Sequence, residues 1–556
     1  MVTPPSAPRP GRDRFVAAID QGTTSTRCLV LDEHAVVRGS AQLEHAQHYP
    51  QPGWVEHDPL EIWANTAAVV GRALATAGVE ASDLVACGVA NQRETAVVWE
   101  HATGRPVHPA VVWQDTRTEA RCRRLAPTPE AVERWRAVTG LPPSTYFAGP
   151  KIAWILDHVD GARERAEAGE LLAGTVDSWL VWNLTGGVDG GVHVTDVTNA
   201  SRTLLMDLRS LSWSAELADE TGVPLRVLPE IRSSAEVYGH GHRTGPLAGV
   251  PVAAALGDQH AALVGQACFE PGSSKCTYGT GGFLLTNTGD RPVRSRHGLL
   301  TTVAYQLGAE PPTYALEGSV AVAGSLIHWL RDRLELVRDV SEVESLAGSV
   351  DDSGGAYFVP AFSGLYAPRW RPDARGTITG LTAYTGRAHL VRAALEATCF
   401  QTREVADAMA SDTGAVSGAG SGPGPGAAAG AGSALGLREL RVDGGMVANS
   451  LLMQLQADTL QVPVVAPEVV ETTAVGAAFA AGLAVGLWRD RDELRELWRT
   501  GRRWEPRTDS DLPTTRWREW HRAVDRSLGW VATEQHPAAD DDTAGPTVDD
   551  LAKERV

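Results

Sequence analysis

The sequence predicts an α/β protein of two domains that share one plan. The chain has 556 residues, 43% of them hydrophobic, whereas a single core rarely grows beyond roughly 250–300 residues. Apolar strand patterns alternate with helical patterns, as they do in α/β domains. Two strand–turn–strand segments, residues 15–31 and 275–285, carry Gly and Thr at their tips. A motif that recurs in both halves of a chain indicates a duplicated domain plan.

We expect the N-terminal domain to span residues 13–265 and the C-terminal domain to span residues 266–532. Residues 1–12 and the polar, acidic residues 533–556 carry too little apolar surface for a core, so we expect both tails to be disordered. The Gly/Ala/Ser/Pro-rich residues 411–437 are expected to form a flexible surface insertion in the second domain.

The first hairpin begins with an apolar strand over residues 15–19, and a second strand follows over residues 27–31. Thr23, Thr24 and Ser25 in the turn offer hydroxyls and backbone N–H groups, which suit either a phosphate cradle or an ordinary β-turn. Asp20 ends the buried strand at the same tip. Its carboxylate suits Mg²⁺, which prefers oxygen ligands, but an Asp at this place also stabilises turns.

The next elements continue the α/β pattern. Asp58 followed by Pro59 is typical of a helix start, and we expect that helix to run to about Ala77. Buried strands are then expected over residues 84–90, 96–99 and 110–113.

Arg93 and Glu94 follow the strand at residues 84–90. They form either a surface ion pair of little energetic value or a pair that binds hydroxyl groups, since Arg donates and Glu accepts hydrogen bonds. Trp113, Tyr146 and Phe283 could form apolar walls of such a pocket, although isolated aromatic residues more often lie in a core.

Asp258 directly follows the apolar run at residues 252–256. A carboxylate at a strand end could accept the proton of an alcohol during phosphoryl transfer, or it could simply cap a helix or turn. A further strand, residues 440–443, enters the Gly444-Gly445 turn and leads to residues with helical spacing. The glycines allow either the close approach of a flat ligand such as adenine or tight strand–helix packing.

Composition excludes several classes of protein. The net charge of -18 opposes non-specific binding to nucleic acid and to anionic membranes. Lysine occurs only at positions 151, 275 and 553, so 47 of the 50 basic residues are Arg, and none of the lysines fits the P-loop pattern. The chain has no signal-peptide pattern and no apolar run of about 18 residues, and its six scattered cysteines suggest neither zinc nor disulfides. We therefore expect a cytoplasmic protein with buried thiols.

Together these segments resemble the FGGY family of carbohydrate kinases, and within it the members that phosphorylate glycerol. The resemblance covers about residues 15–488. Its matching stretches are residues 19–25 (IDQGTTS), 52–59 (PGWVEHDP), 91–95 (NQRET), 257–259 (GDQ), 376–381 (GTITGL), 389–390 (HL) and 393–396 (AALE). Several matches in this order are far more specific than any one of these motifs alone.

The resemblance implies two ribonuclease H-like domains of the actin-like ATPase fold, with the active-site cleft between them. It implies transfer of the ATP γ-phosphate to glycerol with Mg²⁺, giving ADP and sn-glycerol 3-phosphate, the first step of glycerol catabolism. It also implies a homo-oligomer, either a dimer or a tetramer.

Matching residue by residue, the resemblance assigns three groups. The glycerol ligands would be Arg93, Glu94, Tyr146, Asp258 and Gln259, with Trp113 and Phe283 as apolar walls and Asp258 as the general base. The nucleotide contacts would be Thr23, Thr24, Ser25, Arg27, Thr280, Gly324, His328, Gly445 and Asn449. Asp20 would hold Mg²⁺ through water. His328 stands where the family usually has Gln, which we expect to retune nucleotide affinity without abolishing the chemistry.

Three alternatives remain at this stage. The chain could phosphorylate another polyol or a ketose, it could be an actin-like or chaperone-like ATPase, or it could be a non-catalytic paralogue. Arg93, Glu94 and Asp258 have no explanation in an ATPase that performs only conformational work, and every expected catalytic residue is present. The Arg93-Glu94 pair and the aromatic walls favour a small three-carbon polyol over a larger sugar, which would need a roomier pocket.

Overall fold

The fold is described from a computed structural model over residues 14–414 and 436–531. The tails expected at residues 1–12 and 533–556 lie outside the described residues, as does most of the insertion expected at residues 411–437.

The first half of the chain is built on a six-stranded sheet in the order β13-β14-β5-β1-β2-β3. Its strands are β1 (Phe15–Gln21), β2 (Ser25–Asp32), β3 (Val37–Glu44), β5 (Leu84–Asn91), β13 (Ala235–His240) and β14 (Pro251–Gly257). The three central strands, β14, β5 and β1, are parallel, and the strands on either side pair antiparallel. The predicted hairpin is therefore confirmed as β1–β2.

The second half is built on a seven-stranded sheet in the order β17-β18-β16-β15-β21-β22-β23. Its strands are β15 (Ser274–Tyr278), β16 (Gly282–Gly289), β17 (Leu300–Tyr305), β18 (Thr313–Val320), β21 (Leu440–Asp443), β22 (Val464–Pro467) and β23 (Thr500–Trp504). Read from β18 to β23, the pairs are antiparallel, antiparallel, parallel, parallel and antiparallel. The first sheet, read from β3 to β13, has the same sequence of pairings, so the two halves share one plan as predicted.

The first half also contains a separate, smaller four-stranded antiparallel sheet in the order β4-β7-β6-β8. Its strands are β4 (Glu56–His57), β6 (Ala96–Glu100), β7 (Ala110–Val111) and β8 (Leu171–Thr175). β7 is shorter than the strand expected over residues 110–113. The Val112 N–H still donates to the Val55 carbonyl, but the Trp113 N–H donates to the Thr95 hydroxyl and not to a neighbouring strand. The turn between β5 and β6 carries Arg93 and Glu94, so this sheet helps to position them.

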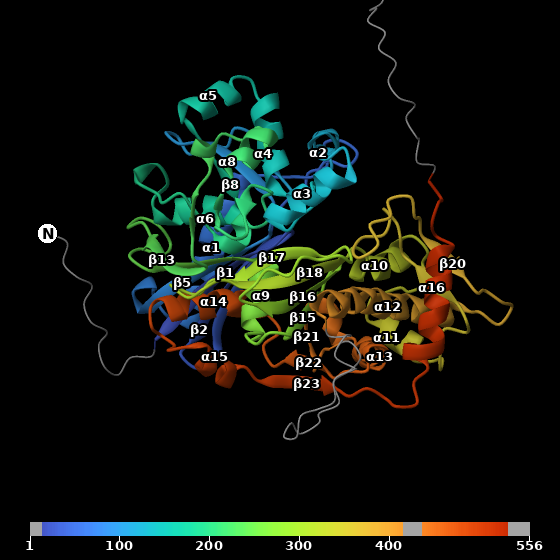
Figure 1. Cartoon of the computed structure of the whole chain (residues 1–556). Coiled ribbons are helices and arrows are strands. Elements are labelled where there is room, and N and C mark those ends of the chain that lie inside the picture. Colours follow the sequence, from blue (N-terminus) through green and yellow to red (C-terminus); the bar gives the residue numbers. More distant parts are fainter. Residues whose placement is uncertain (1–13, 415–435, 532–556) are drawn as a thin grey trace, which may run out of the picture.

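Helices of the first half surround its sheets (Figure 1). They are α1 (Pro59–Ala77), α2 (Glu119–Leu125), α3 (Pro129–Thr139), α4 (Ala148–His158), α5 (Ala162–Ala168), α6 (Val176–Thr185), α7 (Val197–Ala200), α8 (Ala215–Thr221) and α9 (Asp258–Gly265). α1 begins as predicted, since the Asp58 side chain accepts a hydrogen bond from the Leu60 N–H at 2.8 Å, and it ends at Gly78 in the left-handed region.

Helices of the second half pack mainly around the seven-stranded sheet. They are α10 (Gly324–Asp332), α11 (Glu342–Ala347), α12 (Arg387–Thr413), α13 (Ser450–Leu460), α14 (Thr472–Ala484), α15 (Arg491–Leu497) and α16 (Trp517–Asp525). The remaining short strand pairs are β9 (Val194–Asp196) with β12 (Glu230–Arg232), β10 (Met206–Asp207) with β11 (Ser212–Trp213), and β19 (Tyr357–Val359) with β20 (Thr377–Thr379).

One expectation about the insertion was wrong. Residues 411–413 are the last turn of α12 and not part of a loop. Asp412 fixes this turn, because its carboxylate accepts hydrogen bonds from the Ser295 hydroxyl and the Arg296 N–H of a distant segment. A composition rich in small residues could not show that contact.

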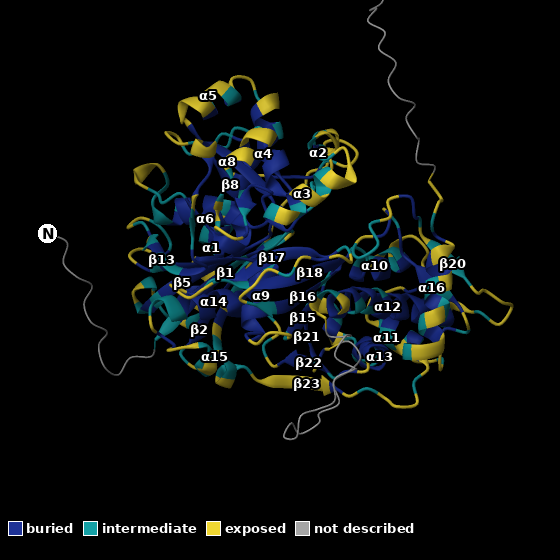
Figure 2. Cartoon of the chain, viewed as in Figure 1, coloured by how far each residue is buried: buried dark blue, intermediate teal, exposed yellow. Residues whose placement is uncertain are grey.

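Two helices join the halves. α14 comes from the second half but packs on β5, β1 and β14 of the first sheet, while α9 packs on β15 and β16 of the second. A side chain at Gly476 would overlap the carbonyl oxygen of Ala261, and one at Gly265 would overlap that of Thr472. The helices therefore touch backbone to backbone. The buried residues around them form one core that includes Leu256 and Leu285 from different sheets, and Figure 2 shows the central sheets largely buried and the outer helices exposed.

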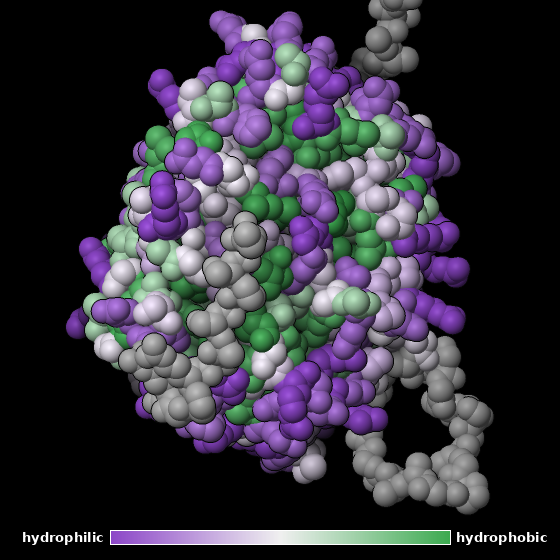
Figure 3. Space-filling model, turned by 90° about the vertical axis from the view of Figure 1, so that its left-hand side faces the viewer, coloured by the Kyte–Doolittle hydropathy of each residue, from purple (hydrophilic) through white to green (hydrophobic). Residues whose placement is uncertain are grey.

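All six cysteines are unpaired and buried, as expected. Among the described residues, no helix combines the length and the apolar character that crossing a membrane requires. In the face shown in Figure 3, hydrophilic side chains cover the rim, while hydrophobic side chains gather nearer the centre and are interrupted by hydrophilic ones.

Candidate functional site

Arg93 and Glu94 are buried, with 3% and 2% of their surface exposed. This excludes the surface ion pair that the sequence left open. Glu94 adopts a positive φ of 59°, a strained conformation for a residue other than Gly. A side chain at Gly257 would approach the Arg93 Cγ to 2.6 Å, so the Gly before Asp258 makes room for the Arg93 stem.

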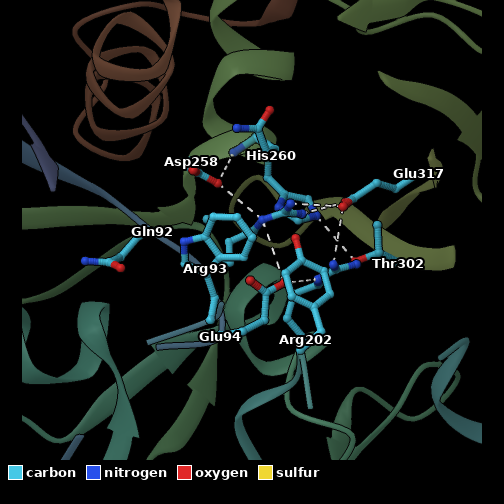
Figure 4. A network of polar contacts seen from close by, with 12 residues as sticks. Gln92, Arg93, Glu94, Arg202, Asp258, His260, Thr302 and Glu317 are labelled. Atoms are coloured by element: carbon cyan, nitrogen blue, oxygen red, sulfur yellow. Dashed lines mark hydrogen bonds and ion pairs between the residues drawn. The ribbon is translucent and has the colours of Figure 1, made fainter. Parts of the chain in front are cut away.

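A network of four buried charges surrounds this turn (Figure 4). The Arg93 guanidinium donates two hydrogen bonds to Glu317, at 2.5 and 2.9 Å. The Arg202 Nε donates to Glu94 at 2.6 Å, and its terminal nitrogen donates to Glu317 at 3.3 Å. Glu317 lies on β18 of the second sheet, whereas the other three residues belong to the first half. The network therefore spans the two halves.

Charges in this network stabilise one another. Burial alone raises the pKa of Glu317, but Arg202 and Arg93 outweigh it and hold that pKa well below its ordinary value. Burial likewise opposes the charge of Arg93, yet Glu317 and Glu94 raise its pKa well above the ordinary value. Both groups are therefore charged at neutral pH and form a buried ion pair. Burial raises the pKa of Glu94 in spite of the opposing charges of Arg202 and Arg93.

Asp258 is the first residue of α9, at the edge of this network. Its Oδ1 lies 3.2 Å from the Arg93 Nε, and 27% of its side chain is exposed, against 2% for Arg93. The Gln259 N–H also donates to Oδ1, at 2.6 Å. One carboxylate oxygen is thus held in place while the group still faces open space.

Three aromatic rings from separate segments meet beside the charges. The centroid of Trp113 lies 5.6 Å from that of Tyr146 and 6.3 Å from that of Phe283, both in edge-to-face geometry. Burial raises the pKa of the Tyr146 hydroxyl well above its ordinary value, so it stays protonated. The Trp113 Nε1 donates to the Thr23 hydroxyl at 2.9 Å, which links the rings to the first hairpin tip.

Asp20 lies at that same tip. Burial is the main reason that its pKa is raised to about 7; Arg27 opposes this rise and nearby Asp258 adds to it. Within residues 14–414 and 436–531, the carboxylate has no hydrogen-bond or ion-pair partner. Asp20 is therefore a carboxylate that lacks a neighbouring positive charge in direct contact.

The other hairpin residues differ in their surroundings. Thr24 is exposed, and the Ser25 hydroxyl accepts from Gln42 at 3.0 Å. Arg27 pairs with Glu471 of the second half and donates to Gln42, so its guanidinium already has partners.

A cavity of about 540 Å³ lies in the second half. Its lining includes four of the residues expected to contact the nucleotide, namely Gly324, His328, Gly445 and Asn449. It also includes apolar side chains, namely Ile327, Val340, Val343, Leu395 and Met446. Thr280 belongs to the same region, since its carbonyl accepts from the Ala323 and Ser325 N–H groups at the start of α10.

The Gly444-Gly445 turn shapes this cavity. Gly444 has a φ of 91°, and a side chain there would overlap the carbonyl oxygen of Tyr278. A Cβ at Gly445 would meet no atom within 4 Å, so this backbone faces open space. Asn449 uses its Oδ1 to cap α13, accepting from the Leu452 N–H at 2.9 Å.

Sequence reasoning missed several residues of the site. Arg202 and Glu317 gave no local signal, because ordinary strand and helix patterns surround them. His260 was not selected, although it directly follows the GDQ stretch at residues 257–259. Burial, then the charge of Arg93, lowers the pKa of His260 far below its ordinary value, so it is neutral where it faces the Thr302 hydroxyl at 3.3 Å. Lys151 and Lys275 were visible only as rare residues. Both are fully buried here.

Comparison with known proteins identifies the family. The sequence models of the N- and C-terminal domains of the FGGY family of carbohydrate kinases match residues 15–265 and 274–485. The chain is 55% identical over 524 residues to "Glycerol kinase 2" of Streptomyces coelicolor, covering 94% of this chain and 98% of that protein. It is 57% identical over 519 residues to "Glycerol kinase" of Nocardia farcinica, covering 93% of this chain and 100% of that protein.

A solved structure has the same arrangement. The crystal structure of Plasmodium falciparum glycerol kinase with ADP matches with a TM-score of 0.82 and 36% identity, covering 93% of this chain and 98% of that one. The expected fold class, two domains of the actin-like ATPase type, is thereby confirmed. The chain belongs to the FGGY family of carbohydrate kinases.

Proposed function

We propose that this protein transfers the γ-phosphate of ATP to glycerol, giving ADP and sn-glycerol 3-phosphate. The observation that carries the proposal is the cluster of buried Arg93 and Glu94 with the partly exposed Asp258, beside three aromatic rings. The relatives named glycerol kinase, at 55% and 57% identity, support the choice of acceptor.

The cluster suits a small polyol. Arg93 can donate to a hydroxyl oxygen, Glu94 can accept from a hydroxyl, and the protonated Tyr146 can do either. The rings of Trp113 and Phe283 would cover C–H groups. Because the ion pairs fix these side chains before binding, little conformational entropy remains to be lost when the acceptor binds.

Asp258 is proposed as the general base. It would take the proton of the attacking hydroxyl as that oxygen forms its bond to the γ-phosphorus and ADP leaves. The Arg93 Nε lies 3.2 Å from its Oδ1 and would keep the carboxylate oriented. Gln259, the next residue, would contribute a further polar contact to the acceptor.

The nucleotide is assigned to the cavity of the second half. Gly445 would allow adenine to approach the backbone closely, and Gly324, His328 and Asn449 would contact the nucleoside. Thr23, Thr24, Ser25 and Thr280 at the two hairpin tips would face the phosphates, and Arg27 would contribute positive charge nearby. Transfer then takes place between the two halves.

Asp20 fits the role of a Mg²⁺ residue. Its carboxylate has a raised pKa and no direct partner in the described part of the chain, so a cation there would be stabilising. The described residues include no cluster of three or more His, Cys, Asp or Glu side chains arranged for a metal, which suits an ion that keeps water and phosphate ligands. When bound, Mg²⁺ would offset negative charge on the phosphates.

ADP release from Mg-ATP tests the proposal. The acceptors are glycerol, xylulose, ribulose, gluconate and none, and the proteins are wild type, Asp258→Asn and a control, Asp219→Asn, on the exposed face of α8. Glycerol-dependent release that Asp258→Asn abolishes and Asp219→Asn retains is the expected result. A preference for a sugar would move the specificity to another member of the family. Acceptor-independent release that survives Asp258→Asn would contradict the kinase assignment and favour an ATPase.

Three further expectations remain proposals. We propose domain limits of 13–265 and 266–532, a homo-oligomeric state of two or four chains, and a cytoplasmic location. Sedimentation of the purified protein measures the oligomeric state, and fractionation of the source cells measures the location.

A further inference from the structure

Lysine is rare in this chain but concentrated at the candidate site. Of the 50 basic residues, 47 are Arg, and the lysines are Lys151, Lys275 and Lys553. The two described lysines both have 0% exposure, although most arginines lie at the surface. Each of them contacts a residue of the proposed glycerol site.

Lys151, on α4, binds three backbone carbonyl oxygens. Its Nζ lies 2.6 Å from the oxygen of Tyr146, 3.3 Å from that of Phe147 and 3.4 Å from that of Glu94. It thereby ties together the two segments that carry Glu94 and Tyr146. Because Glu94 has a strained φ of 59°, an added contact to its carbonyl helps to maintain that conformation.

Lys275, on β15 of the second sheet, binds side chains. Its Nζ donates to the Gln259 Oε1 at 2.5 Å and to the Thr277 hydroxyl at 2.9 Å. An ammonium group can only donate, so it fixes which end of the Gln259 amide faces it. The Nε2 end then points elsewhere, and within the described residues it has no hydrogen-bond partner.

Arginine could not replace either lysine. An ammonium is a compact charge with three donors arranged around one atom, whereas a guanidinium is a planar fork with five donors. Three carbonyls converging on one nitrogen match the first geometry. Nearly all other basic residues of this chain are Arg, and the two buried lysines lie where a compact ammonium group fits the acceptor atoms around it.

We propose that Lys151 and Lys275 are positioning residues for the acceptor alcohol. Lys151 sets the backbones of Glu94 and Tyr146, and Lys275 orients the Gln259 amide so that its Nε2 donates to an acceptor hydroxyl. This inference rests on the proposed function, because it assumes that these three residues bind the acceptor. It adds that both halves of the chain shape the acceptor site through buried lysines.

A double-mutant cycle tests the Lys275 part. The variants are Lys275→Met, Gln259→Met and the pair, and the readouts are KM for glycerol, KM for ATP and kcat. Each single variant is expected to raise KM for glycerol about tenfold or more and to leave KM for ATP within about twofold. The pair is expected to match Gln259→Met alone, because Lys275 acts through that amide. Effects that multiply in the pair, or an unchanged KM for glycerol, would overturn the inference.

Conservative variants separate positioning from general damage. Lys275→Gln keeps an amide donor and is expected to recover part of the affinity, whereas Lys275→Arg is expected to recover none. Full activity of Lys275→Arg would contradict the argument from shape. If Lys275→Met does not unfold cooperatively, Lys275→Gln paired with Gln259→Met completes the cycle.

Lys151→Met is compared with Arg403→Met. The Arg403 guanidinium also donates to backbone carbonyls, those of Thr459 and Pro513, but away from the acceptor residues. Both variants are expected to lower Tm, and only Lys151→Met is expected to raise KM for glycerol by about tenfold or more. An equal KM in the two variants would overturn the role of Lys151. If wild-type protein shows no glycerol-dependent ADP release, the proposed function is contradicted. The double-mutant cycle is then run with the acceptor that the protein prefers.

Discussion

The charged cluster around Arg93 and the cavity around Gly445 are formed by different kinds of residue. The cluster consists of long ionised side chains that neutralise one another, and Glu317 reaches it from the other half of the chain. The cavity is lined by glycines and apolar side chains, and its Gly445 backbone faces open space. Under the proposed function, one region would recognise its ligand with fixed charges and the other with shape.

This difference predicts how each region responds to substitution. Removing one charge from a buried set leaves its partners unpaired, which costs both stability and ligand affinity. Adding volume to an open cavity costs affinity for the ligand but little stability, because no packed atoms are displaced. The following predictions test that contrast, from the largest expected effect to the smallest.

Glu317→Gln should have the largest effect on stability. It leaves Arg93 and Arg202 buried without their shared carboxylate, so we expect a loss of about 3–5 kcal/mol in the free energy of unfolding and a raised KM for glycerol. Urea unfolding and acceptor kinetics measure both. The control is Glu344→Gln in the cavity wall. Among the described residues, only the Leu451 N–H donates to this carboxylate, so there we expect a loss of less than about 1.5 kcal/mol. Equal losses would contradict the contrast.

Gly445→Leu should affect nucleotide affinity and spare the fold. The side chain enters open space, so we expect KM for ATP to rise by more than about tenfold while the free energy of unfolding changes by less than about 1 kcal/mol. Its neighbour provides the control. Gly444→Ala forces a Cβ onto a residue with a φ of 91° beside the Tyr278 carbonyl, and it should lose about 1–3 kcal/mol of stability. If both variants lose the same stability, the cavity is not open as described.

Asp20→Asn should stabilise the protein while impairing catalysis. Burial raises the pKa of Asp20 from 3.8 to about 7, so between these values the folded protein binds a proton that the unfolded chain has released. The contribution of Asp20 to stability therefore falls as pH rises from about 4 to 7, and it stays low above pH 7. Because the residue is partly exposed, we expect the variant to gain only roughly 1–2 kcal/mol above pH 7 and nothing near pH 4.

Tm of wild type and Asp20→Asn between pH 4 and 8, without nucleotide or metal, measures that difference. All other titrating groups are common to both proteins, so the gap between the two curves reports Asp20. A gap that does not widen with pH would show that the carboxylate is not destabilised at neutral pH.

His328→Gln should have the smallest effect. His328 is exposed at the rim of the cavity, so we expect KM for ATP to change by less than about threefold and KM for glycerol to stay the same. Steady-state kinetics with each substrate varied in turn measures this. A change in KM for glycerol would show that the cavity and the charged cluster are energetically coupled.

Much of the fold follows from local sequence patterns. The hairpin tips, the helix that starts at Asp58 and the strand before Gly444 were all predicted, because turn residues, caps and apolar periodicity act over a few residues. The insertion was predicted to begin at residue 411, but α12 continues to Thr413. Its last turn is held by hydrogen bonds from residues 295–296 to Asp412, which local patterns could not show.

The candidate site divides in the same way. Residues with motif-like neighbours, such as Arg93, Asp258 and Gly445, could be selected from the sequence. Glu317 could not, because its role depends on an ion pair with a residue 224 positions away. Lys151 and Lys275 stood out by composition, yet only their contacts showed what they bind.

The sequence by itself determined the α/β class, the duplicated plan and the family, and it selected Arg93, Asp258 and Gly445 as candidate site residues. Tertiary structure alone decided that α14 packs on the first sheet, that the charged cluster spans the two halves and that the two buried lysines contact Glu94 and Gln259. The physical reason is distance along the chain. Propensity, capping and periodicity operate between near neighbours, whereas buried ion pairs and helix packing depend on where remote segments meet.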